Sequence, residues 1–254
     1  MNKKYKKHCN EMNKKWMNEH LDVTDKTKND FQMDYLPEPY LNFNAGENPL
    51  YVLTTNPGNG MDDQSRDVIL KDKSKIGICK DDKYEEIAEK LAKFYLEDLE
   101  GAAKRRIDGF LEISKNANFN GVIQLESYPF HSKTFPKKDN FLGDSKEDEL
   151  FKEYTNLLKE TLVDKTVIVL SAVGTQKSLS KKSIDTDWLT WQADIMGLDL
   201  KNLKEKVLVE KEKKVTSIFI YQKTNNITKG FILMMGGNNL PNHDALVKIV
   251  NLIN

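Results

Sequence analysis

The apolar stretch Leu50–Thr55, with the sequence LYVLTT, runs directly into Asn56, Pro57 and Gly58. Its apolar side chains are consecutive and do not alternate with polar ones. This is typical of a strand whose two faces are both covered in a parallel sheet. Asn, Pro and Gly favour turns for steric reasons. The stretch therefore predicts a buried parallel strand that ends in a tight turn.

Four other short apolar runs have the length of a strand and are rich in β-branched residues. They span residues 122–125, 166–171, 215–221 and 230–235. The first two of these do not alternate either, and they predict further parallel strands. The last two are joined by Lys223-Thr224-Asn225-Asn226, which predicts a hairpin.

Helical periodicity separates these runs. Between residues 84 and 99, apolar side chains recur at spacings of three and four, with charged residues on the other face. A second helix is expected to begin near Ser145, whose hydroxyl suits the first turn, and a third follows Pro241. The alternation predicts an α/β fold, namely a three-layer α/β/α sandwich with a short, mainly parallel central sheet.

The composition favours one globular domain preceded by an arm. The chain has 254 residues, and 39 Lys and Arg balance 39 Asp and Glu, which excludes an extended polybasic protein. Residues 1–30 have little apolar periodicity and change from basic to acidic. We therefore expect a flexible charged arm over 1–30 and a single domain over 31–254.

Other classes of protein are excluded on similar grounds. No stretch approaches the roughly 20 apolar residues that cross a bilayer, and the lysine-rich start leads into no apolar signal segment. The two cysteines, Cys9 and Cys79, support neither a disulfide framework nor a metal knuckle. We expect a cytoplasmic protein with no metal, no cofactor and no membrane partner.

Ligands of open α/β sheets bind beyond the carboxyl ends of the strands, so the segments that follow the strands are the candidate sites. After the first strand, Gly58 and Gly60 let backbone amides approach a ligand, although a simple turn explains the same residues. After the last strand, Asn238 and Asn239 precede Leu240. Leu240 is either a minor packing contact or a wedge that enters a base stack.

The segment after the second strand makes the most specific prediction. Glu126 ends an apolar run and is followed by Tyr128, Phe130 and His131. A buried carboxylate is costly unless it is paired or binds a ligand, and an acceptor beside flat rings suits a nucleobase. The alternative is that Glu126 forms a salt bridge while Tyr128 and Phe130 fill the core.

Together these features resemble the uracil-DNA glycosylase superfamily, particularly its single-strand-selective and mismatch-specific branch. The resemblance rests on a first strand that ends in Asn56-Pro57-Gly58, a second strand whose Glu126 lies three residues before Pro129, and a last strand followed by a short loop and a final helix. It covers residues 48–254. It implies hydrolysis of the bond between deoxyribose and a base rotated out of the DNA.

The resemblance also implies roles for individual residues. Asn56 would orient the hydrolytic water, with Asp62 or Asp63 as a helper, and the backbone of Pro57 and Gly58 would contact the base. Leu240 would fill the place that the flipped base leaves in the stack. No aromatic residue lies between Pro57 and Lys83, where the family has its stacking ring.

Two further departures from the family pattern change the expected substrate. The family usually has Asn at the position of Glu126, whose carboxylate offers only acceptors and would repel uracil O4. We therefore expect a cytosine-type or modified base, stacked on Tyr128 or Phe130. The family's His-Pro-Ser loop is also absent, so the donor to the base would come from one of four other residues, Asn238, Asn239, His131 or His243.

The expected function is a DNA glycosylase that acts in repair or in defence against modified foreign DNA, as a monomer. The alternatives are a catalytically inactive nucleic-acid or nucleotide sensor on the same fold, and a hydrolase of free nucleosides. Because the net charge is zero, DNA affinity would come from a local basic rim and would be modest and salt-sensitive. The rim candidates are Lys3, Lys4, Lys6, Lys7, Lys133, Lys137, Lys138, Lys177, Lys181 and Lys182.

Overall fold

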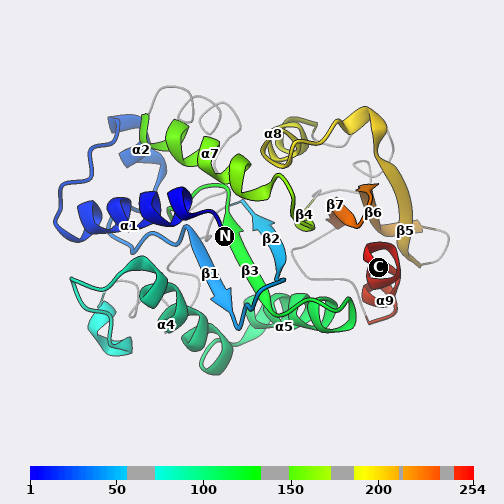
Figure 1. The fold of residues 1–254 in the computed structure, drawn as a ribbon, viewed down its shortest axis with the longest axis horizontal. Coiled ribbons are helices and arrows are strands. Elements are labelled where there is room, and N and C mark those ends of the chain that lie inside the picture. Colours follow the sequence, from blue (N-terminus) through cyan, green and yellow to red (C-terminus); the bar gives the residue numbers. More distant parts are fainter. Residues whose placement is uncertain (56–71, 133–148, 173–185, 212–213, 235–242) are drawn as a thin grey trace. The chain divides into compact units, whose positions relative to one another are not determined.

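The structure, a computed structural model, describes residues 1–55, 72–132, 149–172, 186–211, 214–234 and 243–254 (Figure 1). The chain divides into two compact units of interleaved segments. The first comprises residues 1–42, 55–99 and 125–161, and the second comprises 43–54, 100–124 and 162–254. The described residues form seven α-helices and a seven-stranded sheet of order β1-β3-β2-β4-β7-β6-β5. The α/β class predicted from the sequence is confirmed.

Three parallel strands form the centre of the second unit. They are β2 (Leu50–Thr54), β4 (Val167–Ala172) and β7 (Ile227–Met234). β4 pairs in parallel with β2 on one side and with β7 on the other, with Val52 opposite Ile168. Both of these side chains are fully buried, as uninterrupted apolar runs require. The prediction of parallel strands at β2 and β4 is confirmed.

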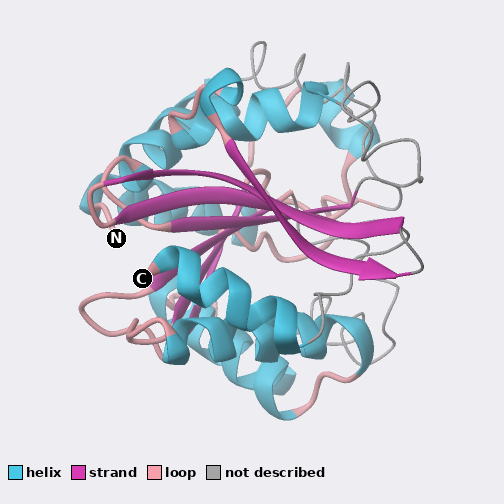
Figure 2. Cartoon of the chain, turned by 90° about the vertical axis from the view of Figure 1, so that its right-hand side faces the viewer, coloured by secondary structure: helices cyan, strands magenta, loops and turns pink. Residues whose placement is uncertain are grey.

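Two antiparallel strands extend the sheet beyond β7. β6 (Lys214–Thr224) pairs with β7, and β5 (Lys204–Lys211) pairs with β6. Thr224 lies opposite Ile227, and Asn225 in the turn has a φ of 55°, which Asn adopts more readily than most residues. The predicted hairpin is confirmed, and Figure 2 shows the twist of the strands.

The sheet is larger than the sequence predicted. A short sheet was expected, and this was wrong because the described residues form seven strands. The pairs β2–β4 and β4–β7 are parallel, whereas β7–β6 and β6–β5 are antiparallel. The strands missed were those at the two edges, β1 (Tyr40–Phe43) and β5. β1 has only four residues, and five of the eight residues of β5 are Lys or Glu. Short or charged strands are typical of sheet edges, and they give little apolar signal.

The helices of the second unit are α5 (Gly101–Asn116), α8 (Thr186–Met196) and α9 (His243–Ile253). α9 packs against α5, β5 and β7, and its residue Ile249 is fully buried. The prediction of a helix after Pro241 is therefore confirmed, although Pro241 itself lies outside the described residues.

The helices of the first unit are α1 (Lys3–Met17), α2 (Asp25–Asp30), α4 (Tyr84–Glu97) and α7 (Glu149–Leu162). α4 matches the predicted helix of 84–99 and buries Ile87, Ala88 and Leu91, which share one face. α7 matches the body of the second predicted helix, whereas its expected start at Ser145 lies outside the described residues.

The flexible arm expected over residues 1–30 is not what the structure shows. Residues 3–17 form α1, in which Tyr5 and Cys9 are fully buried and Met12 is 1% exposed. Asn2 caps the helix by accepting a hydrogen bond of 2.8 Å from the backbone N–H of Lys4. The buried side chains recur at spacings of three and four, but lysines surround them and mask this periodicity in the sequence.

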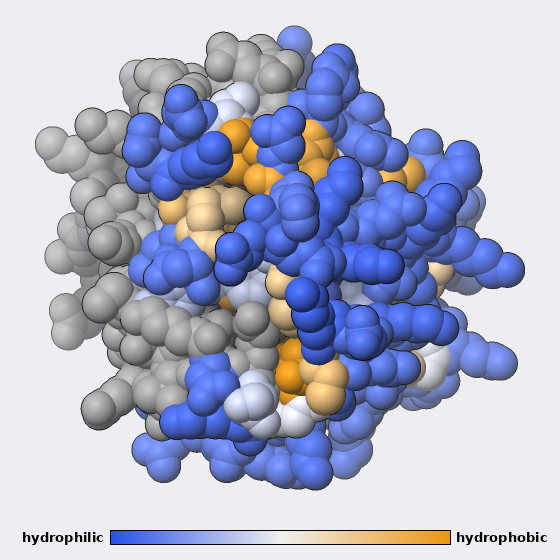
Figure 3. Space-filling view, turned by 90° about the vertical axis from the view of Figure 1, so that its left-hand side faces the viewer, coloured by the Kyte–Doolittle hydropathy of each residue, from blue (hydrophilic) through white to orange (hydrophobic). Residues whose placement is uncertain are grey.

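The surface of the described residues is mainly polar. Figure 3 shows one face, on which hydrophilic side chains surround small apolar areas. Val163 and Val247 are the large apolar side chains that count as exposed in the described part of the chain. Within that part, no helix combines the length and the apolar character needed to pass through a membrane.

Candidate functional site

The loop after β3 (Val122–Glu126) meets the chain that follows β2 within the first unit. The backbone N–H of Tyr128 donates a hydrogen bond of 2.9 Å to the carbonyl oxygen of Thr55. Thr55 is the residue directly before Asn56. The structure thus brings the start of the first candidate loop to the second candidate loop, as expected when neighbouring strands end at one edge of a sheet.

Glu126 lies at the carboxyl end of β3 and is 1% exposed. Its backbone is held on both sides, because its N–H donates to the carbonyl of Pro39 at 3.1 Å and its carbonyl accepts from the hydroxyl of Tyr154 at 2.6 Å. The Tyr154 hydroxyl also lies 3.0 Å from that of Tyr5 on α1. Helix α7 therefore holds the backbone of Glu126 directly, and α1 supports that contact through Tyr5.

The hydroxyls that hold Glu126 stay neutral over a wide pH range. Burial raises the pKa of Tyr5 and Tyr154 well above the ordinary value, with their mutual repulsion as a further cause for Tyr5. Burial likewise raises the pKa of the Cys9 thiol beside them. Neutral phenols are hydrogen-bond donors, which is what the backbone carbonyls of Glu126 and Pro39 require.

Tyr128 and Phe130 lie in the core of the first unit. Tyr128 is stacked on Phe31, with ring centres 5.2 Å apart and planes 12° apart, and Phe151 lies 4.8 Å from Tyr128. Phe130 meets Phe151 edge to face at 5.7 Å. Both rings of the loop are buried. This arrangement matches the alternative in which the two aromatic residues fill the core, rather than a free stacking surface for a base.

His131 is fully buried beside a carboxylate that the sequence analysis did not single out. Its Nε2 lies 2.9 Å from Oε1 of Glu38, and the Tyr95 hydroxyl lies 2.7 and 2.8 Å from the two oxygens of Glu38. The ring of Tyr35 lies 5.5 Å from that of His131. The sequence offered one signal for this site, because Glu38 stands between Pro37 and Pro39 in an otherwise apolar stretch.

Several predicted site residues lie outside the described residues, so the structure places none of them. These are Asn56, Pro57, Gly58, Asp62, Asp63, Asn238, Asn239 and Leu240. His243 is described and begins α9, where its Nδ1 lies 2.5 Å from Glu112 on α5. Among the residues that are described, no group of three or more His, Cys, Asp or Glu side chains is arranged to hold a metal ion.

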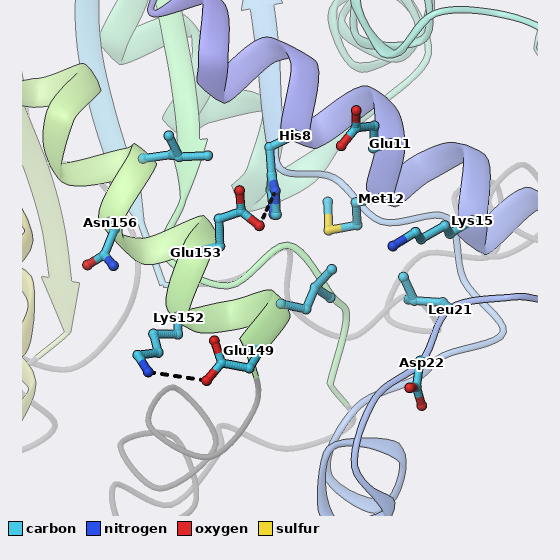
Figure 4. A pocket seen from close by; sticks show the side chains of 12 residues that line it. His8, Glu11, Met12, Lys15, Leu21, Asp22, Glu149, Lys152, Glu153 and Asn156 are labelled. Atoms are coloured by element: carbon cyan, nitrogen blue, oxygen red, sulfur yellow. Dashed lines mark hydrogen bonds and ion pairs between the residues drawn. The ribbon is translucent and has the colours of Figure 1, made fainter.

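A separate cleft of about 590 Å³ lies between α1, residues 21–22 and α7 (Figure 4). His8 and Glu153 point toward each other there, with Nδ1 and Oε2 3.4 Å apart. Burial lowers the pKa of His8, and Glu153 and Glu11 oppose that change. None of the predicted site residues lines this cleft.

No known family model matches the chain, and no match was found among curated proteins or solved structures.

Proposed function

We propose that the chain is a DNA glycosylase that hydrolyses the N-glycosidic bond of a flipped cytosine-type or modified base. We further propose the three-layer arrangement of uracil-DNA glycosylases and action as a cytoplasmic monomer. The observation that carries the proposal is the buried carboxylate of Glu126 at the end of β3. Thr55, the last residue before Asn56, is hydrogen-bonded to the loop that follows this carboxylate.

The chemistry of Glu126 selects the base. An ionised carboxylate accepts hydrogen bonds and donates none. Cytosine protonated at N3 presents N–H groups on its pairing edge, and protonation lets it depart as a neutral molecule. Uracil presents a carbonyl oxygen at the equivalent position and would be repelled. Because charge develops on the base and the sugar as the bond breaks, a fixed carboxylate in a water-poor site supplies much of the catalysis.

The test uses single-stranded and duplex oligonucleotides that carry cytosine, 5-substituted cytosines, uracil or a purine at one position. Abasic sites are measured by cleavage in alkali. We expect release of a cytosine-type base and none of uracil. The Glu126→Gln variant should lose at least about 100-fold in rate, because the charge that stabilises the reacting base is gone. The Asn56→Ala variant should lose base release while DNA binding persists.

Glu86→Gln is the matched control, because it makes the same chemical change at an exposed position of α4. Its rate should equal that of the native protein. Efficient uracil release by the native protein, or cytosine-type release that Glu126→Gln leaves intact, would overturn the assignment of Glu126.

One observation favours a second function, a nucleic-acid or nucleotide sensor without catalysis. Tyr128 and Phe130 contact Phe31 and Phe151 in the core, so the loop after β3 presents neither ring to a base. A sensor would bind oligonucleotides in a salt-dependent manner and leave no abasic site in any of them.

A further inference from the structure

Three buried polar side chains from separate segments form a chain of contacts in the first unit. Tyr95 comes from α4, Glu38 precedes β1, and His131 follows β3. The Tyr95 hydroxyl is 2.7 and 2.8 Å from the oxygens of Glu38, and Oε1 of Glu38 is 2.9 Å from Nε2 of His131. Their exposed fractions are 3%, 1% and 0% respectively. A charge at this depth is strongly coupled to its neighbours, because little water screens it.

The contacts indicate where the protons lie. The Tyr95 hydroxyl donates to Glu38, so both oxygens of the carboxylate act as acceptors. The nitrogen that faces Oε1 is then the one that carries a proton, which places N–H on Nε2 of His131. In neutral histidine the other nitrogen, Nδ1, is then the acceptor.

Backbone hydrogen bonds hold the segment of Glu38 against the loop of His131. The N–H of Glu38 donates to the carbonyl of Pro129, and the N–H of Gln32 donates to the carbonyl of His131, both at 2.7 Å. The segment that carries Glu38 is thus bonded at two points to the loop that carries His131. These bonds keep the two backbone segments together, and burial leaves the two side chains little freedom to move.

We propose that Glu38, held by Tyr95, is a positioning residue that fixes the Nε2–H form of His131 and stabilises its imidazolium. The assignment of the tautomer does not depend on the proposed function, whereas the role of His131 in the reaction rests on it. There, Nδ1 accepts the proton that water loses as its oxygen adds to C1′ of the sugar. The bond from C1′ to the N3-protonated base breaks, the base departs as a neutral molecule, and the proton on Nδ1 passes to solvent water, which restores His131.

The first test is the ring state of His131 by NMR of protein labelled with ¹⁵N-histidine. The chain has four histidines, so the His131→Gln variant assigns the signals. We expect a proton bound to Nε2 and none bound to Nδ1. It should move upfield in Glu38→Gln, where the acceptor is neutral, and by a smaller amount in Tyr95→Phe. A native protein with the proton on Nδ1 and not on Nε2, or a proton signal that Glu38→Gln does not move, overturns the proposal.

Tyr84→Phe is the matched control for Tyr95→Phe. Tyr84 is another fully buried tyrosine of α4, but its hydroxyl donates to the backbone carbonyl of Tyr40. It should leave the His131 signal in place. If Glu38→Gln does not fold, Tyr95→Phe still decides the question, because it keeps the carboxylate and removes a single hydroxyl. An unmoved His131 signal in Tyr95→Phe then counts against the proposal.

The second test is base release by the same variants. Once a substrate is identified, Glu38→Gln should lower kcat by at least about tenfold and leave KM little changed, as expected when an acid–base group is disturbed. Tyr84→Phe should keep the native rate. If the native protein releases no base from any oligonucleotide, the proposed function fails while the NMR result still decides the role of Glu38. A native kcat in Glu38→Gln overturns the catalytic part of the proposal.

Discussion

Replacement of Tyr5 by alanine tests how firmly α1 belongs to the folded chain. Tyr5 is fully buried, and its hydroxyl lies 3.0 Å from both the carbonyl of Pro39 and the hydroxyl of Tyr154. Removing a buried aromatic ring costs about 3–5 kcal/mol. We therefore expect the free energy of unfolding to fall by about 4 kcal/mol. In a chain of this size that corresponds to a loss of about 8–16 °C in Tm.

The assay is urea unfolding followed by circular dichroism and by tryptophan fluorescence, whose transitions must coincide for the free energies to be compared. Two controls separate the contributions. Tyr5→Phe keeps the ring and removes only the hydroxyl, so it should cost about 1 kcal/mol. Lys4→Ala changes an exposed residue of the same helix and should stay within about 0.5 kcal/mol of the native protein.

The reasoning fails if Tyr5→Ala unfolds at the same urea concentration as Lys4→Ala. Such a result would mean that α1 is detached in solution and that residues 1–30 form a mobile arm. A full loss of folding in Tyr5→Ala, with Tyr5→Phe close to the native protein, would agree with the expected cost, since natural domains have only about 5–15 kcal/mol to lose.

Three other predictions concern stability. Burial lowers the pKa of His8 below its ordinary value of 6.5, so the unfolded chain binds this proton at a higher pH than the folded chain does. The free energy of unfolding should therefore fall as the pH drops below about 6.5. Urea unfolding of His8→Gln should show a smaller fall over the same pH range. Gly121 and Gly77 both have positive φ, +78° and +72°, but a Cβ at 121 would lie 2.3 Å from the carbonyl oxygen of Asn44, whereas a Cβ at 77 meets nothing within 4 Å. In the same assay, Gly121→Ala should therefore lower the free energy of unfolding by over about 1 kcal/mol more than Gly77→Ala does. Burial raises the pKa of several tyrosines above 10.0, so the unfolded chain ionises first and stability falls above about pH 10, with the ultraviolet absorbance of phenolate appearing only on unfolding. Those tyrosines are Tyr5, Tyr84 and Tyr154.

The central strands could be predicted because burial on both faces demands apolar residues at every position. β2 and β4 have buried apolar residues at consecutive positions, and the apolar runs in the sequence predicted both strands for that reason. The edges could not be predicted in the same way. Among the described strands, β5 has a partner on one side only and tolerates five charged residues among eight, so its sequence resembles a polar loop.

The candidate site could be predicted in part. Glu126 and His131 were found because polar residues after an apolar strand are unusual, and both are buried in the structure. Glu38 was missed because its partners, Tyr95 and His131, lie 57 and 93 positions away in the chain, and local pattern carries no information on such pairs. The core positions of Tyr128 and Phe130 were an open alternative, since aromatic rings suit a base site and a core equally well.

The contact between α1 and α7 has a consequence for synthesis of the protein. Tyr5 and Tyr154 are separated by 149 positions in the chain. A ribosome that adds about 5–20 residues per second needs about 7–30 s to make that stretch. During this time the apolar side of α1 lacks its partner on α7 and is open to chaperones or to other nascent chains. Until α7 is made, the exposed lysines keep the outer side of the helix hydrated, and their like charges repel other copies of the helix. They are Lys3, Lys4, Lys7, Lys14 and Lys15.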